Sequence, residues 1–577
     1  MKVLLLGINA RYTHINTALY YLRQSIAGLK FTVNILEKTI NDNIWDIIND
    51  IFNNNPDILC LSHYIWNQKH LEFIIRDIKK ILPNLKIICG GPDISYNAEE
   101  WLKQFPEIDY IIKGAGEKAF RVLAENNFHY DDKIICLKNY PFECIPIPYI
   151  EEDFQVLQNR YIYYEASRGC PFKCSYCMSS RDDQLIEYKS FNLVKSELDF
   201  LLNIENFKPI IIKFIDRSFN VNSDLAIQIW TYLKQLHTHT KFHFEIHPLY
   251  FTEDQYRALQ DIPENRFQFE IGIQSIHNKT INLINRKGKW EEIYNKLKLL
   301  TSLKSIHLHF DLIAGLPGES YSDITQSFNQ ILDLKPDHFQ PGFLKILPGT
   351  ALEQENKKWD YRYQLKAPYR ILSSSTISFK ELQNIEIAET GLDILYNSNI
   401  FKIFISEYFK AYQNRYNLFF DFGLYLQSLD INKNLSDRKK IFVLLYEFIK
   451  NNIDKSINEL FLDCIRFDWF LQAKTHYYPE ELDAIHSDKF KEKYYNEFKS
   501  FWQDCNSENI ITNNSNIQQF KHKLKNVCFF APKNALFMNR ILNNELGMVI
   551  VNQTQIYKIS NKNEETKIIE ISFNDVV

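Results

Sequence analysis

Three cysteines with close, regular spacing are the residues of this sequence best suited to chemistry. Cys170, Cys174 and Cys177 form a CxxxCxxC triplet within YIYYEASRGCPFKCSYC, directly after an aromatic, strand-like run. A cubane [4Fe-4S] cluster is normally held by four cysteine thiolates. Three thiolates on one tight loop therefore predict a cluster in which one iron keeps an open coordination position.

A partial zinc site, or three unrelated thiols, is the alternative interpretation of the triplet. Zinc prefers a fourth Cys or His ligand at matching spacing, and the nearest histidine, His129, lies far upstream. The triplet therefore favours an iron-sulfur cluster.

The triplet resembles the hallmark of the radical SAM superfamily, in which an aromatic residue, here Tyr176, precedes the last cysteine. The resemblance implies that the amino and carboxylate groups of S-adenosylmethionine (SAM) chelate the open iron. It also implies that the reduced cluster cleaves SAM to a 5'-deoxyadenosyl radical. Cys170, Cys174 and Cys177 would then be both metal ligands and catalytic residues.

The region around the triplet has the pattern of a partial barrel. Strand-like runs alternate with amphipathic stretches between residues 161 and 350, and these runs read YIYYEAS, IIIKFID, KFHFEIHP, FQFEIGIQS, IHLHFDLIAGLP and HFQPGFLKIL. Strand-helix repeats of this kind predict a partial (β/α)6 barrel, in which the chemistry lies at the carboxyl ends of the strands.

Polar residues in an apolar context mark the ends of these runs: Glu245, Gln274, Arg286 and Asp311. Carboxylates can bind an ammonium group and ribose hydroxyls, and a guanidinium can bind a carboxylate. The set resembles the SAM-binding residues of oxygen-independent coproporphyrinogen oxidase, and this implies that the same residues form a SAM pocket here. Asp216, in FIDRSFN, resembles an acidic position near the SAM amino group, although Asp is also a common helix cap.

The amino-terminal part, residues 1–130, has the pattern of a doubly wound parallel sheet. Its apolar runs are VLLLGI, FTVNILE, DILCLSHY, KIICGG and DYIIKG, separated by helix-patterned segments. Ligands of such sheets bind beyond the carboxyl ends of the strands. The polar and small residues that we expect to bind a cofactor there are Ser62, His63, Gly90, Gly91, Gly116 and Glu117.

The order of these two parts resembles the B12-dependent radical SAM enzymes, and the resemblance implies that residues 1–130 bind cobalamin. One motif departs from other cobalamin domains, because the DxHxxG sequence that supplies a cobalt-ligating histidine is absent and the first strand is followed by NARYTHIN. We therefore expect cobalamin with its nucleotide tail detached and no histidine ligand. His14 is the rival cobalt ligand, and a hydrogen-bonded surface or cap histidine is the plainer interpretation of it.

The remaining chain divides into a connection and an extension. Residues 131–160 are predicted to link the domains, and residues 351–577 are predicted to form a mainly helical domain that ends in short strands. This last part resembles the uncharacterised, DUF4080-like extension of one branch of B12 radical SAM proteins. The predicted fold class is α/β, with a Rossmann-like or flavodoxin-like cobalamin domain at 1–130 and the radical SAM barrel at 161–350.

Composition excludes some classes of function. The chain of 577 residues has a net charge of only -4, so no basic field argues for nucleic acid. The opening MKVLLLGINA is interpreted as a strand, and no stretch has the length of a membrane span. The ten cysteines follow no disulfide framework, and an oxygen-sensitive cluster favours the reducing cytoplasm.

These observations lead to an expected activity. The resemblance implies a cobalamin-dependent radical SAM enzyme, most simply a methyltransferase acting on an unactivated carbon of a small-molecule or peptide substrate. An external electron donor such as flavodoxin or ferredoxin is implied as a partner. The alternatives are ring-forming or rearranging radical chemistry, and methylthiotransfer, for which Cys60 and Cys89 are poorly placed. An alternative of another class is a non-catalytic cobalamin or iron-sulfur sensor, against which the apparent SAM pocket argues.

Overall fold

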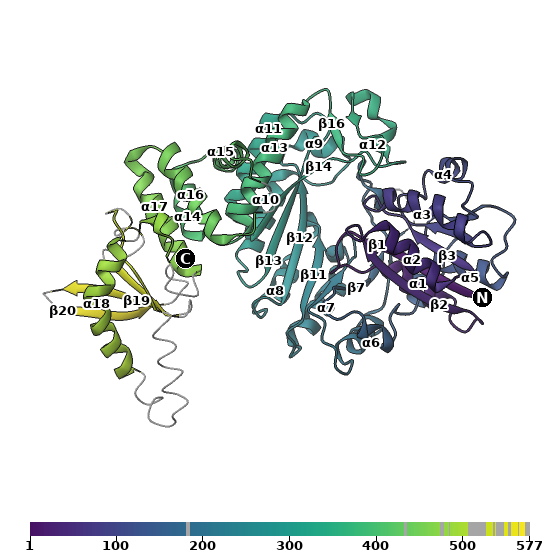
Figure 1. The fold of residues 1–577 in the computed structure, drawn as a ribbon, viewed down its shortest axis with the longest axis horizontal. Coiled ribbons are helices and arrows are strands. Elements are labelled where there is room, and N and C mark those ends of the chain that lie inside the picture. Colours follow the sequence, from purple (N-terminus) through teal and green to yellow (C-terminus); the bar gives the residue numbers. More distant parts are fainter. Residues whose placement is uncertain are drawn as a thin grey trace. The chain divides into compact units, whose positions relative to one another are not determined.

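A parallel six-stranded sheet forms the amino-terminal domain (Figure 1). Its strand order is β2-β1-β3-β4-β5-β6, and helices alternate with the strands. The central strand β3 is buried along its whole length, because helices cover both faces of a doubly wound sheet. The strands are β1 (Lys2–Asn9), β2 (Thr32–Thr39), β3 (Ile58–Ser62), β4 (Lys86–Gly90), β5 (Tyr110–Ile112) and β6 (Ile134–Ile135). The helices are α1 (Thr17–Ser25), α2 (Ile44–Asn54), α3 (Gln68–Ile81), α4 (Ala98–Gln104) and α5 (Glu117–Glu125).

A second parallel six-stranded sheet, in the order β14-β13-β12-β11-β10-β7, forms the predicted partial barrel. The strands are β7 (Ile162–Tyr164), β10 (Ile211–Phe214), β11 (Lys241–Ile246), β12 (Phe267–Gln274), β13 (His307–Ala314) and β14 (His338–Phe343). The helices between them are α6 (Phe191–Leu202), α7 (Ser223–Gln235), α8 (Glu253–Leu259), α9 (Asn278–Leu283), α10 (Trp290–Thr301) and α11 (Tyr321–Asp333). The α/β class predicted from the sequence is confirmed. The amino-terminal sheet extends further than predicted, because its sixth strand, β6, lies within residues 131–160, which were expected to link the domains.

Strict alternation along the barrel strands separates two environments. In β12, the residues at every second position from Phe267 to Ile273 are buried, and the intervening Gln268, Glu270 and Gln274 are half-buried. Successive side chains of a strand point to opposite faces of the sheet. The apolar set therefore packs beneath the helices, and the polar set faces the lumen of the barrel.

Shorter elements connect the two sheets and follow the barrel. The linker holds two 3-10 turns, η1 (Phe142–Cys144) and η2 (Glu151–Gln155), and the cluster loop is flanked by the paired strands β8 (Ser167–Arg168) and β9 (Glu187–Tyr188). After β14 come α12 (Ala351–Gln354), the turn η6 (Asn356–Trp359) and an antiparallel hairpin of β15 (Arg362–Tyr363) and β16 (Ile371–Ser373).

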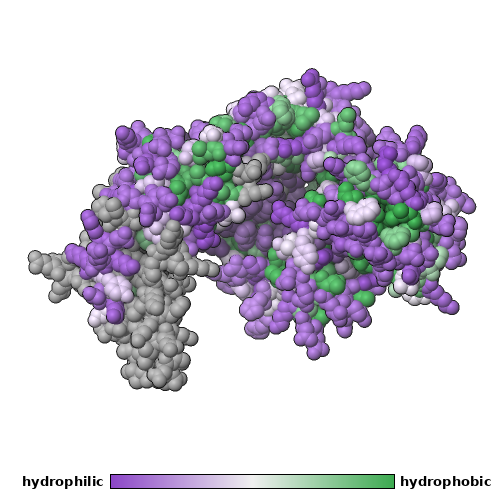
Figure 2. Space-filling model, viewed as in Figure 1, coloured by the Kyte–Doolittle hydropathy of each residue, from purple (hydrophilic) through white to green (hydrophobic). Residues whose placement is uncertain are grey.

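The computed structural model describes residues 1–180, 185–431, 435–472, 478–483, 485–505, 527–534, 537, 540, 547–551, 555–562 and 565–571. The chain divides into two compact units, Met1–Leu382 and Gln383–Val577. Both sheets described above belong to the first unit. Within the described ranges, every helix is too short or too polar to span a bilayer. Hydrophilic side chains cover most of the face seen in Figure 2.

The second unit is helical and ends in an antiparallel sheet, as predicted. Asp468 of α17 accepts hydrogen bonds from the backbone N–H groups of Ile403 and Phe404 at the start of α14. The helices from the unit boundary onward are α13 (Phe379–Leu392), α14 (Lys402–Ala411), α15 (Arg415–Ser428), α16 (Arg438–Asn452), α17 (Lys455–Gln472) and α18 (Ile485–Cys505). The strands are β17 (Val527–Phe530), β18 (Gly547–Val551), β19 (Gln555–Lys562) and β20 (Glu565–Ile571).

Candidate active site

The cysteine triplet lies on a loop that is anchored on both sides. Ser175 N–H donates to the Ile284 carbonyl at 2.9 Å, and Asn285 Nδ2 donates to the Lys173 carbonyl at 2.8 Å. On the other side, Leu352 N–H at the start of α12 donates to the Ser175 carbonyl at 2.9 Å. Hydrogen bonds from two separate elements therefore fix the backbone of the loop.

The three thiols share one electrostatic environment. Burial raises the pKa of Cys170 and Cys174, and the neighbouring thiolates raise both pKa values further. A cationic iron cluster would relieve this mutual repulsion, so the donor set fits the cluster predicted from the sequence. Across the described residues, no three His, Cys, Asp or Glu side chains are grouped as ligands of one metal ion. The thiolates of a cubane each bind a different iron atom and so need no such convergence.

Arg286 connects the loop to the end of β12. Its Nη2 donates to the Gly272 carbonyl at 2.5 Å, and its Nη1 lies 3.9 Å from the Sγ of Cys174. The guanidinium also contacts the hydroxyl of Tyr176, whose pKa burial raises. The structure thus brings three of the predicted residues together: Cys174, Tyr176 and Arg286.

Gln274 ends β12 in an unusual conformation. Its φ of +71° lies in the left-handed region, and a Cβ on Gly272 would lie only 2.1 Å from Gln274 Nε2. The Oε1 atom of Gln274 is buried without a hydrogen-bond partner. A buried, unpaired acceptor held against a glycine is suited to bind a donor group of a ligand.

Glu245, near the carboxyl end of β11, and Asp311, in the middle of β13, lie among other carboxyl groups. Burial raises the pKa of Glu245 to about 7, and the carboxyl groups of Glu270, Asp216 and Asp311 raise it while Arg217, 3.6 Å away, lowers it. Burial also raises the pKa of Asp311, and His309, 3.2 Å away, lowers it. Carboxylates crowded in this way favour a cationic ligand, and SAM carries both a sulfonium and an ammonium group.

Asp216 supports the chain that leads into the cluster loop. Its two oxygens accept hydrogen bonds from Ala166 N–H at 3.1 Å and from Ser167 Oγ at 2.5 Å. Burial raises the pKa of Asp216 to about 7, although these hydrogen bonds lower it. Both oxygens are thus engaged by the segment just before Arg168, and neither acts as a helix cap.

A cavity of about 750 Å³ opens between the amino-terminal sheet and the barrel. The predicted cofactor-binding residues that line it are Ser62, Gly90, Gly91, Gly116 and Glu117. Gly91 has a φ of +116°, and a Cβ there would lie 2.4 Å from the His63 carbonyl oxygen. Only glycine fits at that position, and the small side chains leave the strand ends open to a bulky ligand.

His63 lies elsewhere. Its side chain is completely buried, meets the ring of Trp101 edge-on at 4.9 Å between centroids, and does not line the cavity. Burial lowers the pKa of His63 to about 3. The structure therefore places this predicted residue in the interior of the domain.

His14 lines the cavity next to the first barrel strand. Its Nδ1 contacts the hydroxyl of Tyr163, and its ring meets Tyr161 edge-on. Burial, Lys213 and Arg11 lower the pKa of His14. His14 is therefore hydrogen-bonded to the first barrel strand through one of its two ring nitrogens.

The barrel supplies the opposite wall of the same cavity. The barrel-side residues that line it include Tyr163, Glu165, Arg168, Met178, Ser179 and Arg217. Arg168 precedes Cys170 by two residues, and Met178 follows Cys177 directly. One cavity therefore borders both the glycine-rich strand ends and the two ends of the cluster loop.

A ladder of ionisable residues in the barrel lumen was not identified from the sequence. His243 Nε2 lies 3.0 Å from Glu270 Oε2, and the rings of His309 and His338 are 4.3 Å apart. Despite its burial, the pKa of Glu270 falls to about 2 because His243, His309 and Lys213 favour its ionised form. The sequence feature that could have revealed this ladder is the alternation of apolar and ionisable residues in KFHFEI, FQFEIGIQ and HLHFDLIA.

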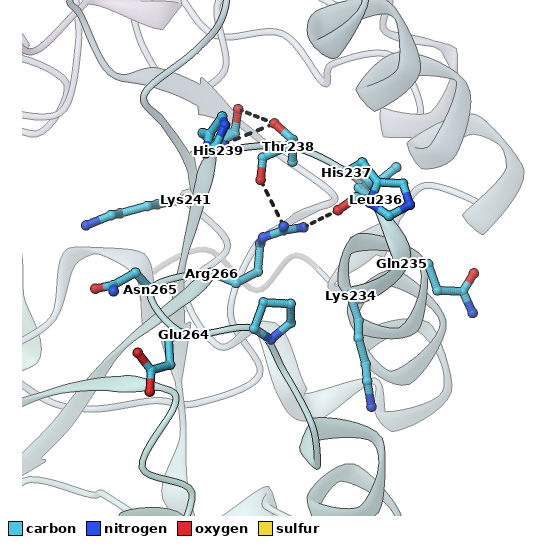
Figure 3. A pocket seen from close by; sticks show the side chains of 12 residues that line it. Lys234, Gln235, Leu236, His237, Thr238, His239, Lys241, Glu264, Asn265 and Arg266 are labelled. Carbon is cyan, nitrogen blue, oxygen red and sulfur yellow. Dashed lines mark hydrogen bonds between the residues drawn. The ribbon is translucent and has the colours of Figure 1, made fainter. Parts of the chain in front are cut away.

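A further hollow of about 610 Å³ lies at the amino ends of β11 and β12, between residues 234–241 and 263–266. Figure 3 shows Arg266 reaching the carbonyl groups of Leu236 and Thr238, both 2.8 Å away. The guanidinium thus ties two loops together. Because the chemistry of such barrels lies at the carboxyl ends of the strands, this hollow is not the candidate site.

Three family models match the chain. They are the B12 binding domain over residues 3–124, the Radical SAM superfamily over residues 164–331, and a protein of unknown function, DUF4080, over residues 357–533. The first two matches coincide with the two parallel sheets.

Known proteins share parts of this arrangement. The cobalamin-dependent radical SAM methyltransferase TokK of Streptomyces tokunonensis is 23% identical over 347 residues, which cover 53% of this chain and 49% of TokK. A tRNA-2-methylthio-N(6)-dimethylallyladenosine synthase of Thermodesulfovibrio yellowstonii is 23% identical over 294 residues, or 48% of this chain and 64% of that enzyme. The chain thus spans about half the length of TokK.

The solved structure of the cobalamin-dependent S-adenosylmethionine radical enzyme OxsB with aqua-cobalamin bound shares the fold. Its TM-score is 0.56 at 15% identity, and the match covers 91% of this chain and 84% of OxsB.

The chain thus combines a B12 binding domain with a radical SAM domain, and it shares its fold with OxsB. Such a protein has one domain for cobalamin and one for a [4Fe-4S] cluster with SAM. Within this class, the chain is one whose barrel is followed by a DUF4080 domain.

Proposed function

We propose that this protein is a cobalamin-dependent radical SAM enzyme that methylates an unactivated carbon. The observation that carries the proposal is the single cavity bordered by Gly90 and Gly91 on one side and by Arg168 and Met178 on the other. When bound, cobalamin and the SAM-ligated cluster supply a transferable methyl group and a radical that abstracts hydrogen. Both kinds of chemistry must act on one substrate carbon, and the shared cavity provides the space for this.

The residues of the cluster side divide into ligands and a SAM pocket. Cys170, Cys174 and Cys177 hold the cluster in this proposal, and Arg286 fixes their loop against the end of β12. The unpaired Oε1 of Gln274 accepts a hydrogen bond from SAM. Glu245 and Asp311 supply negative charge for its cationic groups.

The residues of the cobalamin side combine small side chains with two aromatic rings. Ser62, Gly90 and Gly91 let the corrin approach the strand ends. Tyr64 and Trp66, which also line the cavity, stack with centroids 4.4 Å apart and rings inclined by only 10°. Aromatic faces of this kind pack against a flat macrocycle and exclude water from it. A dry chamber protects a reactive radical from side reactions.

Anaerobic reconstitution with iron, sulfide and cobalamin tests this proposal. The wild-type chain should bind about four iron atoms, and Cys174→Ala should lose them. Incubation with SAM and a reductant should yield 5'-deoxyadenosine and S-adenosylhomocysteine, whereas enzyme without cobalamin should yield only the former. 5'-Deoxyadenosine without S-adenosylhomocysteine from the cobalamin-loaded enzyme would exclude methyl transfer and favour ring-forming or rearranging chemistry.

Two further candidates are separated by the same experiment. Methylthiotransfer is favoured by the similarity to the tRNA-modifying synthase, but Cys60 and Cys89 are buried within strands β3 and β4. An iron content well above four atoms per chain would support it. A cluster that binds SAM without cleaving it would support the sensor alternative.

A further inference from the structure

The first residues of the DUF4080 region belong to the first compact unit, which contains both parallel sheets. Residues 361–373, which contain β15 and β16 and which we term the strap, lie within the DUF4080 match at 357–533 but also within the unit Met1–Leu382. The match therefore does not describe the helical second unit alone.

The base of the strap is fixed to the carboxyl ends of the last two barrel strands. Tyr361 Oη donates to the Gly315 carbonyl at 3.0 Å, just after β13, and Ile371 N–H donates to the Leu344 carbonyl at 3.1 Å, just after β14. Gly315 has a φ of +92°, and a Cβ there would lie 2.0 Å from Ile371 Cδ1. The absence of a side chain at Gly315 thus lets Ile371 of the strap pack directly against the backbone.

The tip of the strap contacts the amino-terminal domain. Lys366 Nζ pairs with Glu72 at 2.8 Å, and Ala367 N–H donates to Gln68 Oε1 at 3.0 Å, both acceptors being on α3. Lys366 is two-thirds exposed, and such surface pairs contribute little.

The contact of Tyr369 is different because it is buried. Tyr369 Oη donates to Asp93 Oδ1 at 3.2 Å, and both residues are at most 5% exposed. Asp93 follows Gly91 by two residues, and Asp93 N–H donates to the His63 carbonyl. The strap is therefore hydrogen-bonded to the loop that contains Gly90 and Gly91, and these two glycines line the cavity.

The strap lies at one edge of the open barrel and connects it to the amino-terminal domain. The sheet ends at β7 on one edge and at β14 on the other. At the β7 edge, Tyr161 N–H donates to the Thr13 carbonyl at 2.8 Å, which ties the barrel to the amino-terminal domain. At the β14 edge, the strap makes the corresponding connection. The amino-terminal domain is thus held at both edges of the partial barrel.

We propose that the strap fixes the Gly90–Asp93 loop relative to the barrel, and that Tyr369 is a positioning residue for this loop, which would contact the corrin. This assignment rests on the proposed function, and it gives the first segment of the DUF4080 domain a role in both cofactor domains. Tyr369 acts through Asp93 and does not itself line the cavity.

Hydrogen–deuterium exchange on the full-length chain, with and without cobalamin, tests this role. Tyr369→Phe removes only the hydroxyl that binds Asp93, so amide exchange across residues 90–97 should become about tenfold faster. Cobalamin, titrated by its absorbance, should bind several-fold more weakly, with the iron content unchanged. The matched control is Tyr363→Phe, on the same strap, whose hydroxyl contacts Asn356 and not the amino-terminal domain. It should behave as wild type.

A second variant and a double variant complete the test. Asp93→Ala removes the acceptor from the other side, and the Tyr369→Phe/Asp93→Ala pair should exchange no faster across residues 94–97 than Asp93→Ala alone. Unchanged exchange at residues 90–97 in Tyr369→Phe, an equal change in Tyr363→Phe, or additive effects in the pair would overturn the assignment. If the wild-type chain fails to bind cobalamin, the proposed function fails, but the exchange data still report on the strap.

Discussion

Glu117 Oε1 accepts a hydrogen bond from Arg168 Nη1 at 2.7 Å and so joins the amino terminus of α5 to the residue that lies two positions before Cys170. Arg168 also pairs with Glu165 at 2.6 Å, and its guanidinium lies over the rings of Tyr21 and Phe142. Although burial lowers the pKa of Arg168, the two carboxylates raise it above its usual value, so the cation is permanent. The pair makes the cavity wall continuous from one domain to the other.

Glu117→Gln should weaken this connection. The substitution removes the negative charge but keeps the shape, and we expect a loss of about 1–3 kcal/mol in the free energy of unfolding together with weaker cobalamin binding. Urea unfolding and cobalamin titration measure these effects. Glu125→Gln is the matched control, because Glu125 lies on the same helix in an exposed pair with Arg121 and should change stability by less than about 1 kcal/mol. Equal effects of the two substitutions would show that Glu117 has no special role.

Arg286→Lys should impair SAM binding while leaving the cluster in place. Lysine cannot reproduce the fork that reaches both the Gly272 carbonyl and Cys174, so the end of β12 loses its connection to the cluster loop. We expect the iron content to be retained and 5'-deoxyadenosine formation at low SAM concentration to fall by about tenfold or more. The exposed neighbour Lys287, substituted by Ala, serves as the control. Wild-type turnover in Arg286→Lys is the result that contradicts this role.

Gly91→Ala should be more harmful than Gly114→Ala. Both glycines have positive φ, at +116° and +82°, so both substitutions introduce a backbone strain of about 1–2 kcal/mol. An added Cβ at Gly114 meets nothing within 4 Å, whereas one at Gly91 meets the His63 carbonyl oxygen at 2.4 Å. We therefore expect Gly91→Ala to lose at least about 1 kcal/mol more than Gly114→Ala. Thermal unfolding of the two variants measures the difference, and equal melting temperatures would contradict the expectation.

Glu319→Gln should flatten the pH dependence of stability. Glu319 is completely buried, its Oε1 accepts a hydrogen bond from Ser275 at 2.5 Å, and its Oε2 has no partner. Burial raises the pKa of Glu319 to about 8, whereas an unfolded glutamate has a pKa of about 4.3. Between these values the folded chain binds more protons than the unfolded chain. The contribution of Glu319 is therefore complete below about pH 4 and is lost as the pH rises towards 8, at up to about 1.4 kcal/mol per pH unit.

Urea unfolding of the wild type and of Glu319→Gln at pH 5.5 and pH 7.5 measures this effect. The midpoint should fall more steeply with pH in the wild type. Parallel pH dependences in the two proteins would mean that Glu319 is already ionised in the folded chain.

The fold could be predicted from the sequence because the signals were local. Runs such as VLLLGI and DILCLSHY are buried on both faces of their sheet, and the barrel strands alternate with a period of two residues. Each such pattern predicts one strand from its own residues. When parallel strands are separated by helices of this length, the rules for connections allow only a few topologies. The six predicted barrel strands are all present in the structure.

The site was predictable where a motif named a residue, and not where a role depends on a distant partner. The residues Cys170, Cys174 and Cys177 could be proposed as cluster ligands from their spacing alone. Nothing local to Tyr369 reveals that its hydroxyl reaches Asp93, which is 276 positions away. His63 shows the converse: its place after a strand suggested the cavity, yet the apolar neighbour Trp101 draws its ring into the interior. The domain boundaries and the assigned site residues stay predictions.

The central claim is that cobalamin and the cluster share one chamber, and electron paramagnetic resonance tests it most directly. Anaerobic enzyme should be prepared with the cobalt in its paramagnetic Co(II) state and the cluster reduced, and the relaxation of the cobalt signal should be measured. The account predicts faster relaxation of the cobalt signal when the reduced cluster is present, and a return to slow relaxation in Cys174→Ala, where the cluster is lost. Identical cobalt relaxation with and without the reduced cluster would contradict the shared chamber.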